Sequence, residues 1–193
     1  MNKTVLLFIF CALATSGCAY TSMDAKIRPD MAVQESNIGD GLPVGVYVID
    51  ERPTQDVGRR SMVGAKVKMK EDVAAIYQTA LVDGLKRKGF AAEAGEIDGS
   101  NLKVEIRALA YDVSAGWWTG GIETDSAIKA YANGPAANYE RLYRASDEDR
   151  TVIVPGAKSS NEKLNAIVTE TLRELLDDQK LLETLAANAR PAS

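Results

Sequence analysis

Chemistry in this chain would have to rest on carboxylates, because histidine is absent. The 193 residues contain no histidine and only two cysteines, Cys11 and Cys18. This composition excludes Ser-His-Asp and Cys-His catalysis and the usual zinc, copper and iron ligand sets. Neither the GxGxxG nor the P-loop phosphate-binding pattern occurs. What remains are Asp50-Glu51 and the run Asp147-Glu148-Asp149, which as paired carboxylates could cleave a glycosidic bond.

Both acidic stretches also have ordinary structural interpretations. Asp50-Glu51 ends a short apolar run beside a turn, and residues 147–149 fit the tip of a solvated hairpin. Adjacent acidic residues without a positioned partner are common on protein surfaces. We therefore predict a protein that is not an enzyme and that uses no metal and no cofactor. The net charge of −4 also argues against a nucleic-acid partner.

The first twenty residues predict export. Lys3 precedes an apolar run, residues 5–14, that is too short to cross a hydrocarbon core of about 30 Å. A charged start, an apolar stretch and small residues after it are typical of a secretory signal. Two outcomes are open: cleavage could release a soluble protein starting at Thr15, or Cys18 could be lipidated.

The cysteine count favours lipidation. Cys11 is lost with the signal in either case, and soluble release would leave Cys18 as a lone thiol in an oxidising compartment. The small residues before Cys18 resemble a bacterial lipobox, in which the cysteine becomes acylated. Several acyl chains anchor a protein stably. We therefore predict a signal peptide over residues 1–17 and a membrane partner reached through lipid on Cys18.

The rest of the chain is predicted to form a tether and one domain. Residues 18–43 lack sustained periodicity and contain Pro29, so they are assigned to the lipidated N-terminus and a flexible tether. Partial order of this tether against the sheet stays an open alternative. Residues 44–190 have the length of a single domain. A hydrophobic content of 46% is enough to build its core.

Two helices and several strands follow from the apolar spacing. Residues 71–89 keep a helical apolar period and end at Gly89, where a C-terminal glycine belongs. Residues 159–189 form the second helix, with Ser159 and Glu162 spaced as a capping box and a bend near Asp177-Asp178. The predicted strands are residues 44–50, 65–70, 90–95, 101–113, 122–134 and 138–147.

The strand at residues 101–113 changes its pattern along its length. Leu102 to Ala110 alternate apolar with polar, but from Leu109 onward the second face also becomes apolar. Consecutive strands with short links indicate an antiparallel meander. The predicted fold class is α/β (α+β): a mixed, largely antiparallel sheet with two helices packed on one face.

Trp117 and Trp118, the only tryptophans, lie between two predicted strands, at or beside a hairpin turn. In one interpretation, one ring covers the end of the sheet and the other lies on the surface. In the other, the pair contacts a partner protein, a glycan or the membrane interface, because tryptophan combines a large ring with one polar N–H. Both interpretations stay open from the sequence.

Four segments resemble the YajG-type bacterial lipoproteins. They are "SGC" at residues 16–18, "LKVEIRALAYDVSAG", "LYRAS" and "NEKLNAIVTETLRELLDD". The resemblance implies an α/β domain that is tethered to the outer membrane and faces the periplasm. Ala19 after the cysteine implies the same sorting in a Gram-negative cell. The resemblance brings no enzymatic activity and gives the tryptophan pair no role.

Three functional classes can be distinguished. We favour a non-enzymatic binding or adaptor module of the cell envelope, whose partner is an envelope protein or peptidoglycan. The alternative is a carrier or accessory component for lipid or another apolar ligand in envelope transport, which needs an apolar cavity between helices and sheet. A peptidoglycan hydrolase would need two carboxyl groups converging in a cleft.

Overall fold

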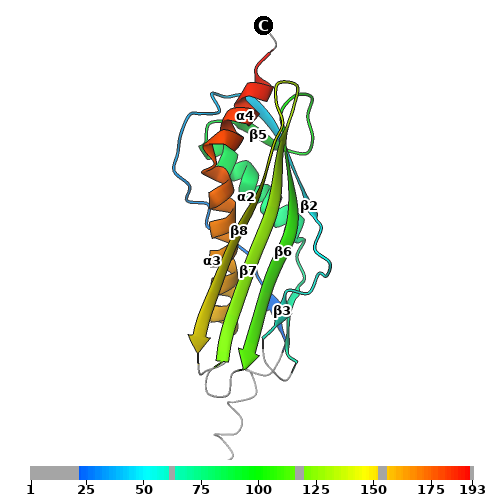
Figure 1. Ribbon diagram of the computed structural model, residues 1–193, viewed down its shortest axis with the longest axis vertical. Coiled ribbons are helices and arrows are strands. Elements are labelled where there is room, and N and C mark those ends of the chain that lie inside the picture. The colour runs from blue at the N-terminus through cyan, green and yellow to red at the C-terminus, as the bar shows by residue number, and fades with distance from the viewer. Residues whose placement is uncertain (1–21, 61–63, 116–119, 152–155, 192–193) are drawn as a thin grey trace, which may run out of the picture.

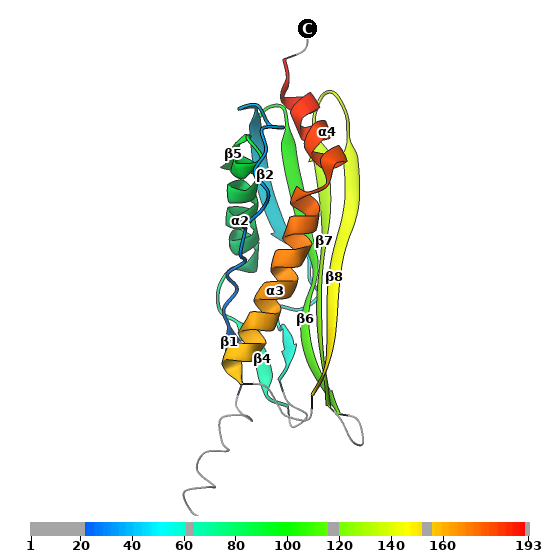
Figure 2. The ribbon, with the colours of Figure 1, turned by 90° about the vertical axis from the view of Figure 1, so that its left-hand side faces the viewer.

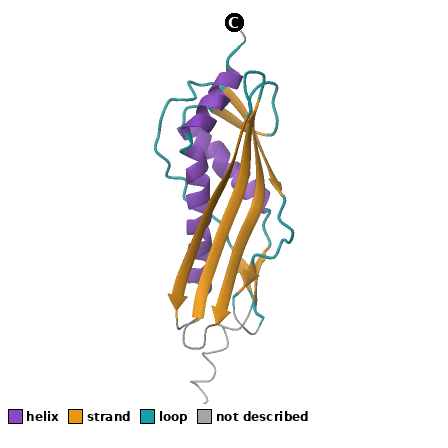
Figure 3. Ribbon diagram, in the orientation of Figure 1, coloured by secondary structure: helices purple, strands orange, loops and turns teal. Residues whose placement is uncertain are grey.

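The fold is a mixed sheet with helices on one side. The computed structural model describes residues 22–60, 64–115, 120–151 and 156–191. Within these residues, eight strands form one sheet, and the three described helices lie against one of its faces (Figures 1, 2 and 3). The predicted fold class is confirmed.

Three long antiparallel strands form the meander that the sequence predicts. β7 pairs with β6 on one side and with β8 on the other, almost without interruption. β8 pairs with β7 alone in the described structure, so it forms one edge of the sheet. The strands are β6 (Asn101–Ala115), β7 (Gly120–Asn133) and β8 (Tyr139–Thr151).

The shorter strands add parallel pairs that the meander prediction did not include. β6 is long enough for its free edge to pair in parallel with two strands in succession, β2 over residues 101–106 and β3 at Tyr111. Gly58 in β3 has φ +142°, and a Cβ there would lie 2.1 Å from the Tyr111 carbonyl oxygen, so this approach requires glycine. The strands are β1 (Met23–Ala25), β2 (Pro43–Asp50), β3 (Gly58–Arg59), β4 (Lys66–Met69) and β5 (Ala91–Ala94).

The helices begin and end close to the predicted positions. In α2 (Val73–Arg87), the Asp72 side chain accepts a hydrogen bond from the Ala75 N–H at 3.2 Å, and Gly89 follows with φ +89°. The predicted bend divides the second helix at Asp178, which caps the next helix. The two parts are α3 (Ala157–Leu176) and α4 (Gln179–Ala189).

The predicted capping box was wrong. α3 begins at Ala157 with Gly156 at the N-cap, and no side chain caps it. Ser159 and Glu162 therefore lie inside the first turns of the helix. The neighbouring Ser160 is buried instead, and its hydroxyl is 3.0 Å from the Tyr111 hydroxyl. Packing against β7 and β8 and this contact to β6, rather than a local cap, set the position of the helix.

A β-bulge explains the pattern change in β6. Ile106 pairs with Ile128 and Ala108 with Ala127, so Arg107 is an extra residue opposite β7. An extra residue exchanges the two faces of the strand. The inward set is therefore not the single alternation that the sequence predicted through Ala110. It consists of Leu102, Val104 and Ile106 before the bulge, and Leu109, Tyr111 and Val113 after it.

The prediction of a flexible tether through residue 43 was wrong from residue 22 onward. Residues 23–25 form β1, which pairs in parallel with β4. The chain then runs along α3. The Ala91 N–H donates to the Leu42 carbonyl at 2.9 Å where the segment joins β2. Alternate apolar side chains of the segment are buried, which gives it a place in the core. They are Met23, Ala25, Ile27, Met31 and Val33.

Candidate functional site

The face of the sheet opposite the helices carries the candidate site. Two large apolar side chains stand out there, Ile49 at 37% exposed and Leu142 at 55% exposed. The register places them in one cross-strand row: Ile49 pairs with Glu105, Glu105 with Lys129, and Lys129 with Leu142. We call the outward side chains of this region the open-face cluster. It consists of Tyr47, Ile49, Lys103, Glu105, Lys129, Tyr131 and Leu142.

Tyr131 is the fixed centre of the open-face cluster. The Nζ atoms of Lys103 and Lys129 lie 5.3 Å and 4.8 Å from its ring centroid, within the range of cation–π attraction. Its hydroxyl donates to Glu105 Oε2 at 3.0 Å. Contacts to both ring and hydroxyl hold the side chain in one position. A rigid aromatic surface of this kind loses little conformational entropy on binding.

Glu105 is the buried acceptor that holds Tyr131 and Lys103 in the open-face cluster. Its side chain is 8% exposed and accepts from Lys103 Nζ at 2.8 Å, and it also pairs with Arg107. Burial alone would raise the pKa of Glu105, but hydrogen bonds from Lys103 and Tyr131 and the nearby cations hold that pKa below its usual value. The carboxylate is therefore charged near neutral pH and acts as an acceptor in the cluster.

The open face changes character toward the other end of the sheet. Past a flat stretch that includes Ala108 and Ala127, three carboxylates share one cross-strand row, Asp112, Glu123 and Glu148. Arg59 contacts Asp112 at 3.4 Å. The face thus presents aromatic, apolar and basic groups at one end and acidic groups at the other, which suits recognition of a surface rather than chemistry on a small molecule.

The predicted lipid site and the tryptophan pair lie outside the described residues. Cys18 precedes Ser22, the first described residue, and Trp117 and Trp118 fall between the paired ends of β6 and β7 at Ala115 and Gly120. The contacts of the tryptophans and the modification of Cys18 stay predictions.

Three of the carboxylates considered for catalysis are held in ion pairs. Asp50 accepts from Arg52 Nε at 2.8 Å and Nη2 at 2.7 Å, and these hydrogen bonds lower the pKa of Asp50. Asp147 and Asp149 both pair with Lys163 of α3, at 3.3 Å and 3.0 Å. Asp147 and Asp149 thus share one lysine, and each of the three carboxylates is neutralised by a cation.

The carrier hypothesis required an apolar cavity between helices and sheet. Large side chains occupy that layer, among them Tyr77, Tyr111 and Tyr143, all fully buried. One groove of about 840 Å³ lies instead on the outer side of α3 beside Arg28 and Asp30, where charged side chains line it. The described residues between helices and sheet therefore give the carrier hypothesis no support. Among the described residues, we find no group of three potential metal ligands and no helix that could span a membrane.

These features define a class of protein: an α/β domain with helices on one sheet face, an open face rich in fixed side chains, and a lipobox-like sequence before it. The chain belongs to the family described as uncharacterized lipoprotein, which it matches over residues 29–186. It is 22% identical to the uncharacterized lipoprotein YajG of Escherichia coli K12, over 98% of this chain and all of that protein. The predicted resemblance is confirmed, and it indicates a membrane-associated envelope protein.

One solved structure supports the fold, and nothing beyond it. A crystal structure of an uncharacterized protein covers 81% of this chain and 97% of its own, with a TM-score of 0.50 and 10% identity. A Xanthomonas campestris protein covers 81% of this chain and 92% of its own, with a TM-score of 0.48 and 13% identity. The comparisons indicate no enzymatic family.

The sequence partly indicated the open-face cluster. Lys103, Glu105 and Arg107 form the polar face of the predicted strand 101–113. Tyr131 belongs to another strand, and only the register between β6 and β7 brings it to Glu105. Alternation within each strand was a usable signal, while the pairing of the strands was not visible locally.

Proposed function

We propose that this protein is a non-enzymatic binding or adaptor module of the Gram-negative cell envelope, anchored by lipid on Cys18 to the outer membrane with its domain facing the periplasm. The open-face cluster is its partner surface, and Trp117 and Trp118 form a second contact. The partner is an envelope protein, with peptidoglycan as the other outcome of the test. The row that joins Ile49 to Leu142 carries the proposal.

The chemistry of the open face supports binding rather than catalysis. Exposed apolar side chains next to a fixed tyrosine resemble the centres of protein interfaces, where aromatic and apolar groups give up water on contact. Lys103 and Lys129 flank the Tyr131 ring and add polar groups at the rim. Asp50, Asp147 and Asp149 are held in ion pairs, which favours the surface itself as the functional feature.

Mass analysis of the native protein tests the anchor. We expect the mature chain to start at Cys18 and to carry acyl groups, because Cys18 is the only cysteine after the predicted signal. The Cys18→Ser variant should then no longer be recovered in the membrane fraction. An unmodified chain that starts at Thr15 would contradict the anchor.

Photo-crosslinking in cells tests the partner surface. A crosslinking amino acid at residue 142 should capture a discrete partner, whereas one at the exposed Glu170 on α3 should capture none. The double variant Ile49→Lys with Leu142→Lys should lose the partner while it stays folded, because both side chains are exposed. Glu170→Lys is the matched control for added charge.

The same experiment covers the hairpin. Crosslinkers at residues 117 and 118 should capture a partner as well, and Trp117→Ala with Trp118→Ala should reduce its recovery. Equal recovery from every variant and from the control would refute both contacts. Capture of glycan fragments in place of protein at residue 142 would assign the surface to peptidoglycan.

A further inference from the structure

The segment that follows the proposed lipid site is clamped to the domain. Residues 22–33, which we call the N-terminal strap, run extended along α3, with every second residue of 23–27 buried (Figure 2). Ile27 is fully buried at the centre of the strap. The strap is thus held in the body by its apolar side, while its backbone polar groups on the other side need separate partners.

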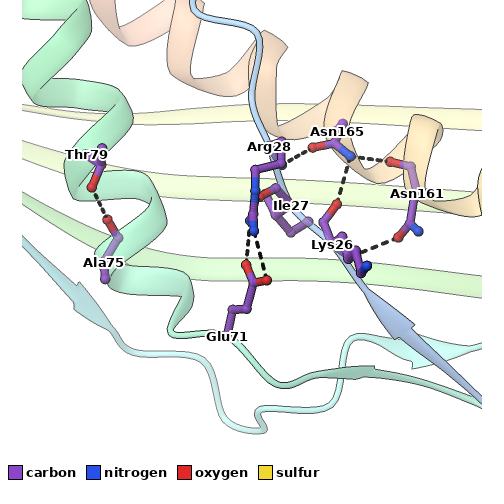
Figure 4. Close-up of polar contacts among 8 residues, drawn as sticks. All are labelled: Lys26, Ile27, Arg28, Glu71, Ala75, Thr79, Asn161 and Asn165. Atoms are coloured by element: carbon purple, nitrogen blue, oxygen red, sulfur yellow. Dashed lines mark hydrogen bonds and ion pairs between the residues drawn. The ribbon is translucent and has the colours of Figure 1, made fainter.

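Those partners form one polar row on α3. Asn161 Oδ1 accepts from the Lys26 N–H at 3.0 Å, and Asn165 Nδ2 donates to the Lys26 carbonyl at 3.0 Å. Asn165 Oδ1 also accepts from the Arg28 N–H (Figure 4). Further along, the Asp30 N–H donates to Thr169 Oγ1 at 3.0 Å, and Arg173 Nη2 donates to the Asp30 carbonyl at 3.0 Å.

The spacing of the row explains why a helix can hold an extended chain. Asn161, Asn165, Thr169 and Arg173 are four residues apart, which on a helix is a rise of about 6 Å. Two residues of an extended chain rise about 6.6 Å. The two repeats match closely over three turns, so successive side chains of α3 meet successive backbone groups of the strap.

A second clamp lies on the side of α2. Arg28 Nη2 donates to Glu71 Oε1 at 2.9 Å, and Figure 4 shows Glu71 on the opposite side of the strap from α3. The pair is exposed, so it adds little to stability by itself. Together with the α3 row it fixes the strap from both sides.

The register shows at which end the strap enters. Met23 pairs with Val67, Val67 with Gly58, and Gly58 with Tyr111. β1 is parallel to β4, β4 antiparallel to β3, and β3 parallel to β6, so β1 runs opposite to β6. The chain that precedes Met23 therefore lies toward the end of the sheet at which β6 ends, at Ala115. The strap enters at the β6–β7 hairpin end, opposite to α4 and the C-terminus (Figures 1 and 2).

Chain length then limits the distance between lipid and domain. Four residue steps separate Cys18 from Ser22, a reach of at most about 14 Å. A strand with the length of β6 spans roughly 50 Å. If residues 22–42 were free, the reach would be roughly 80 Å and either end could approach the bilayer.

We propose that the N-terminal strap orients the domain, so that the β6–β7 hairpin end faces the lipid bilayer and the α4 end points away from it. This inference rests on the lipid attachment of the proposed function. The open-face row at Glu105 lies ten residues before Ala115 on β6, so it is held roughly 33 Å farther from the membrane than the hairpin end. The open-face cluster would therefore bind its partner at that distance from the bilayer.

Orientation can be measured without relying on cellular lipidation. A chain that starts at Cys18 has one thiol, which a maleimide lipid in liposomes can capture. Trp117 and Trp118, the only tryptophans, then report on the hairpin end through quenching by brominated lipids. The matched control replaces both with phenylalanine and adds Asn138→Trp, an exposed position between β7 and β8 at the other end of the sheet.

We expect quenching of the native pair to exceed that of the Asn138→Trp chain at least threefold. Equal quenching would overturn the orientation. Inserting twenty Gly/Ser residues between Thr21 and Ser22 lengthens the reach and leaves the strap intact, so the contrast should fall toward one. A contrast that survives the insertion would also overturn the proposal, since affinity of the rings for lipid would then explain it. Absence of acyl groups on native Cys18 would refute the proposed function but not this measurement.

Discussion

Asp178→Ala is expected to lower the free energy of unfolding by about 3 kcal/mol, because it removes the acceptor of a buried polar cluster. Asp178 Oδ2 accepts from the hydroxyl groups of Tyr139 and Tyr143, at 3.0 Å and 2.8 Å, and from Arg141 Nη1 at 3.0 Å. Asp178 Oδ1 accepts from the Leu181 N–H at 3.1 Å and caps α4. One carboxylate thus joins β8 to the break between α3 and α4.

The expected loss of stability is large because some of the hydrogen-bond donors to Asp178 are buried and cannot bind water instead. Tyr143 is fully buried, and burial together with the neighbouring carboxylate raises the pKa of its hydroxyl, so it stays a donor. Without the Asp178 side chain this hydroxyl and the Leu181 N–H lose their acceptor. An unsatisfied buried donor costs about 1–3 kcal/mol, and loss of a helix cap about 1 kcal/mol more.

The effect should depend on pH. Burial alone would raise the pKa of Asp178, but the hydrogen bonds from Tyr143, Leu181, Tyr139 and Arg141 outweigh it and hold the pKa below its usual value. A lowered pKa in the folded state stabilises the fold above the unfolded pKa of about 3.9, and this stabilisation is lost as pH falls through the folded pKa. The difference between wild type and Asp178→Ala should be constant near neutral pH and shrink below about pH 4.

Urea unfolding at several pH values measures this prediction. Asp83→Ala is the control, because Asp83 is exposed on α2, and it should change stability by less than about 0.5 kcal/mol. A loss for Asp178→Ala no greater than for the control, or a loss that grows toward low pH, would contradict the role of the charged carboxylate.

Local patterns were sufficient for the helices and the meander. The predicted helix at 71–89 contains α2, because its apolar stripe, its acidic start and Gly89 are all local signals. The strands of the meander follow from alternation with short links. The parallel pairs of β2 with β5 and β6 were not predictable in this way, because a strand pattern does not show which distant strand will be its neighbour.

The N-terminal strap shows the same limit. Its apolar residues alternate for only a few positions before Pro29, too few to indicate a strand from the sequence. Its backbone partner Asn161 lies 135 residues away from Lys26. Likewise Lys103 and Glu105 were visible as polar strand residues, but Tyr131 reaches them only through sheet pairing. The roles of Cys18 and the tryptophan pair stay predictions.

The bulge in β6 leads to an unusual prediction about deletions. Deleting Arg107 should leave the domain folded and lower its free energy of unfolding by about 1–2 kcal/mol. The deletion removes the bulge, so the two halves of β6 become one strand with continuous alternation of its faces. Ile106 would remain inward, Ala108 would take the outward position opposite Ala127, and Leu109 would stay inward. Arg107 is the extra residue of the bulge, and the buried side chains of β6 keep their inward positions without it.

Deleting Ala110 should instead prevent folding. The bulge would remain, and every residue after position 109 would move to the opposite face of the sheet. Tyr111, which is fully buried, and Val113 would then point to solvent, and the Tyr111 hydroxyl would lose Ser160. Exposing two such side chains costs roughly 3–6 kcal/mol, comparable with the whole stability of a small domain.

Circular dichroism and urea titration of the two deletions separate the explanations. If the face change in β6 is produced by one extra residue at Arg107, the Arg107 deletion keeps a cooperative transition and the Ala110 deletion shows none. If both deletions unfold the domain alike, the bulge has a structural role beyond the exchange of faces, such as the bend of β6 where its free edge passes from β2 to β3. The pair of variants therefore tests whether the exchange of strand faces at Leu109 is caused by the single extra residue Arg107.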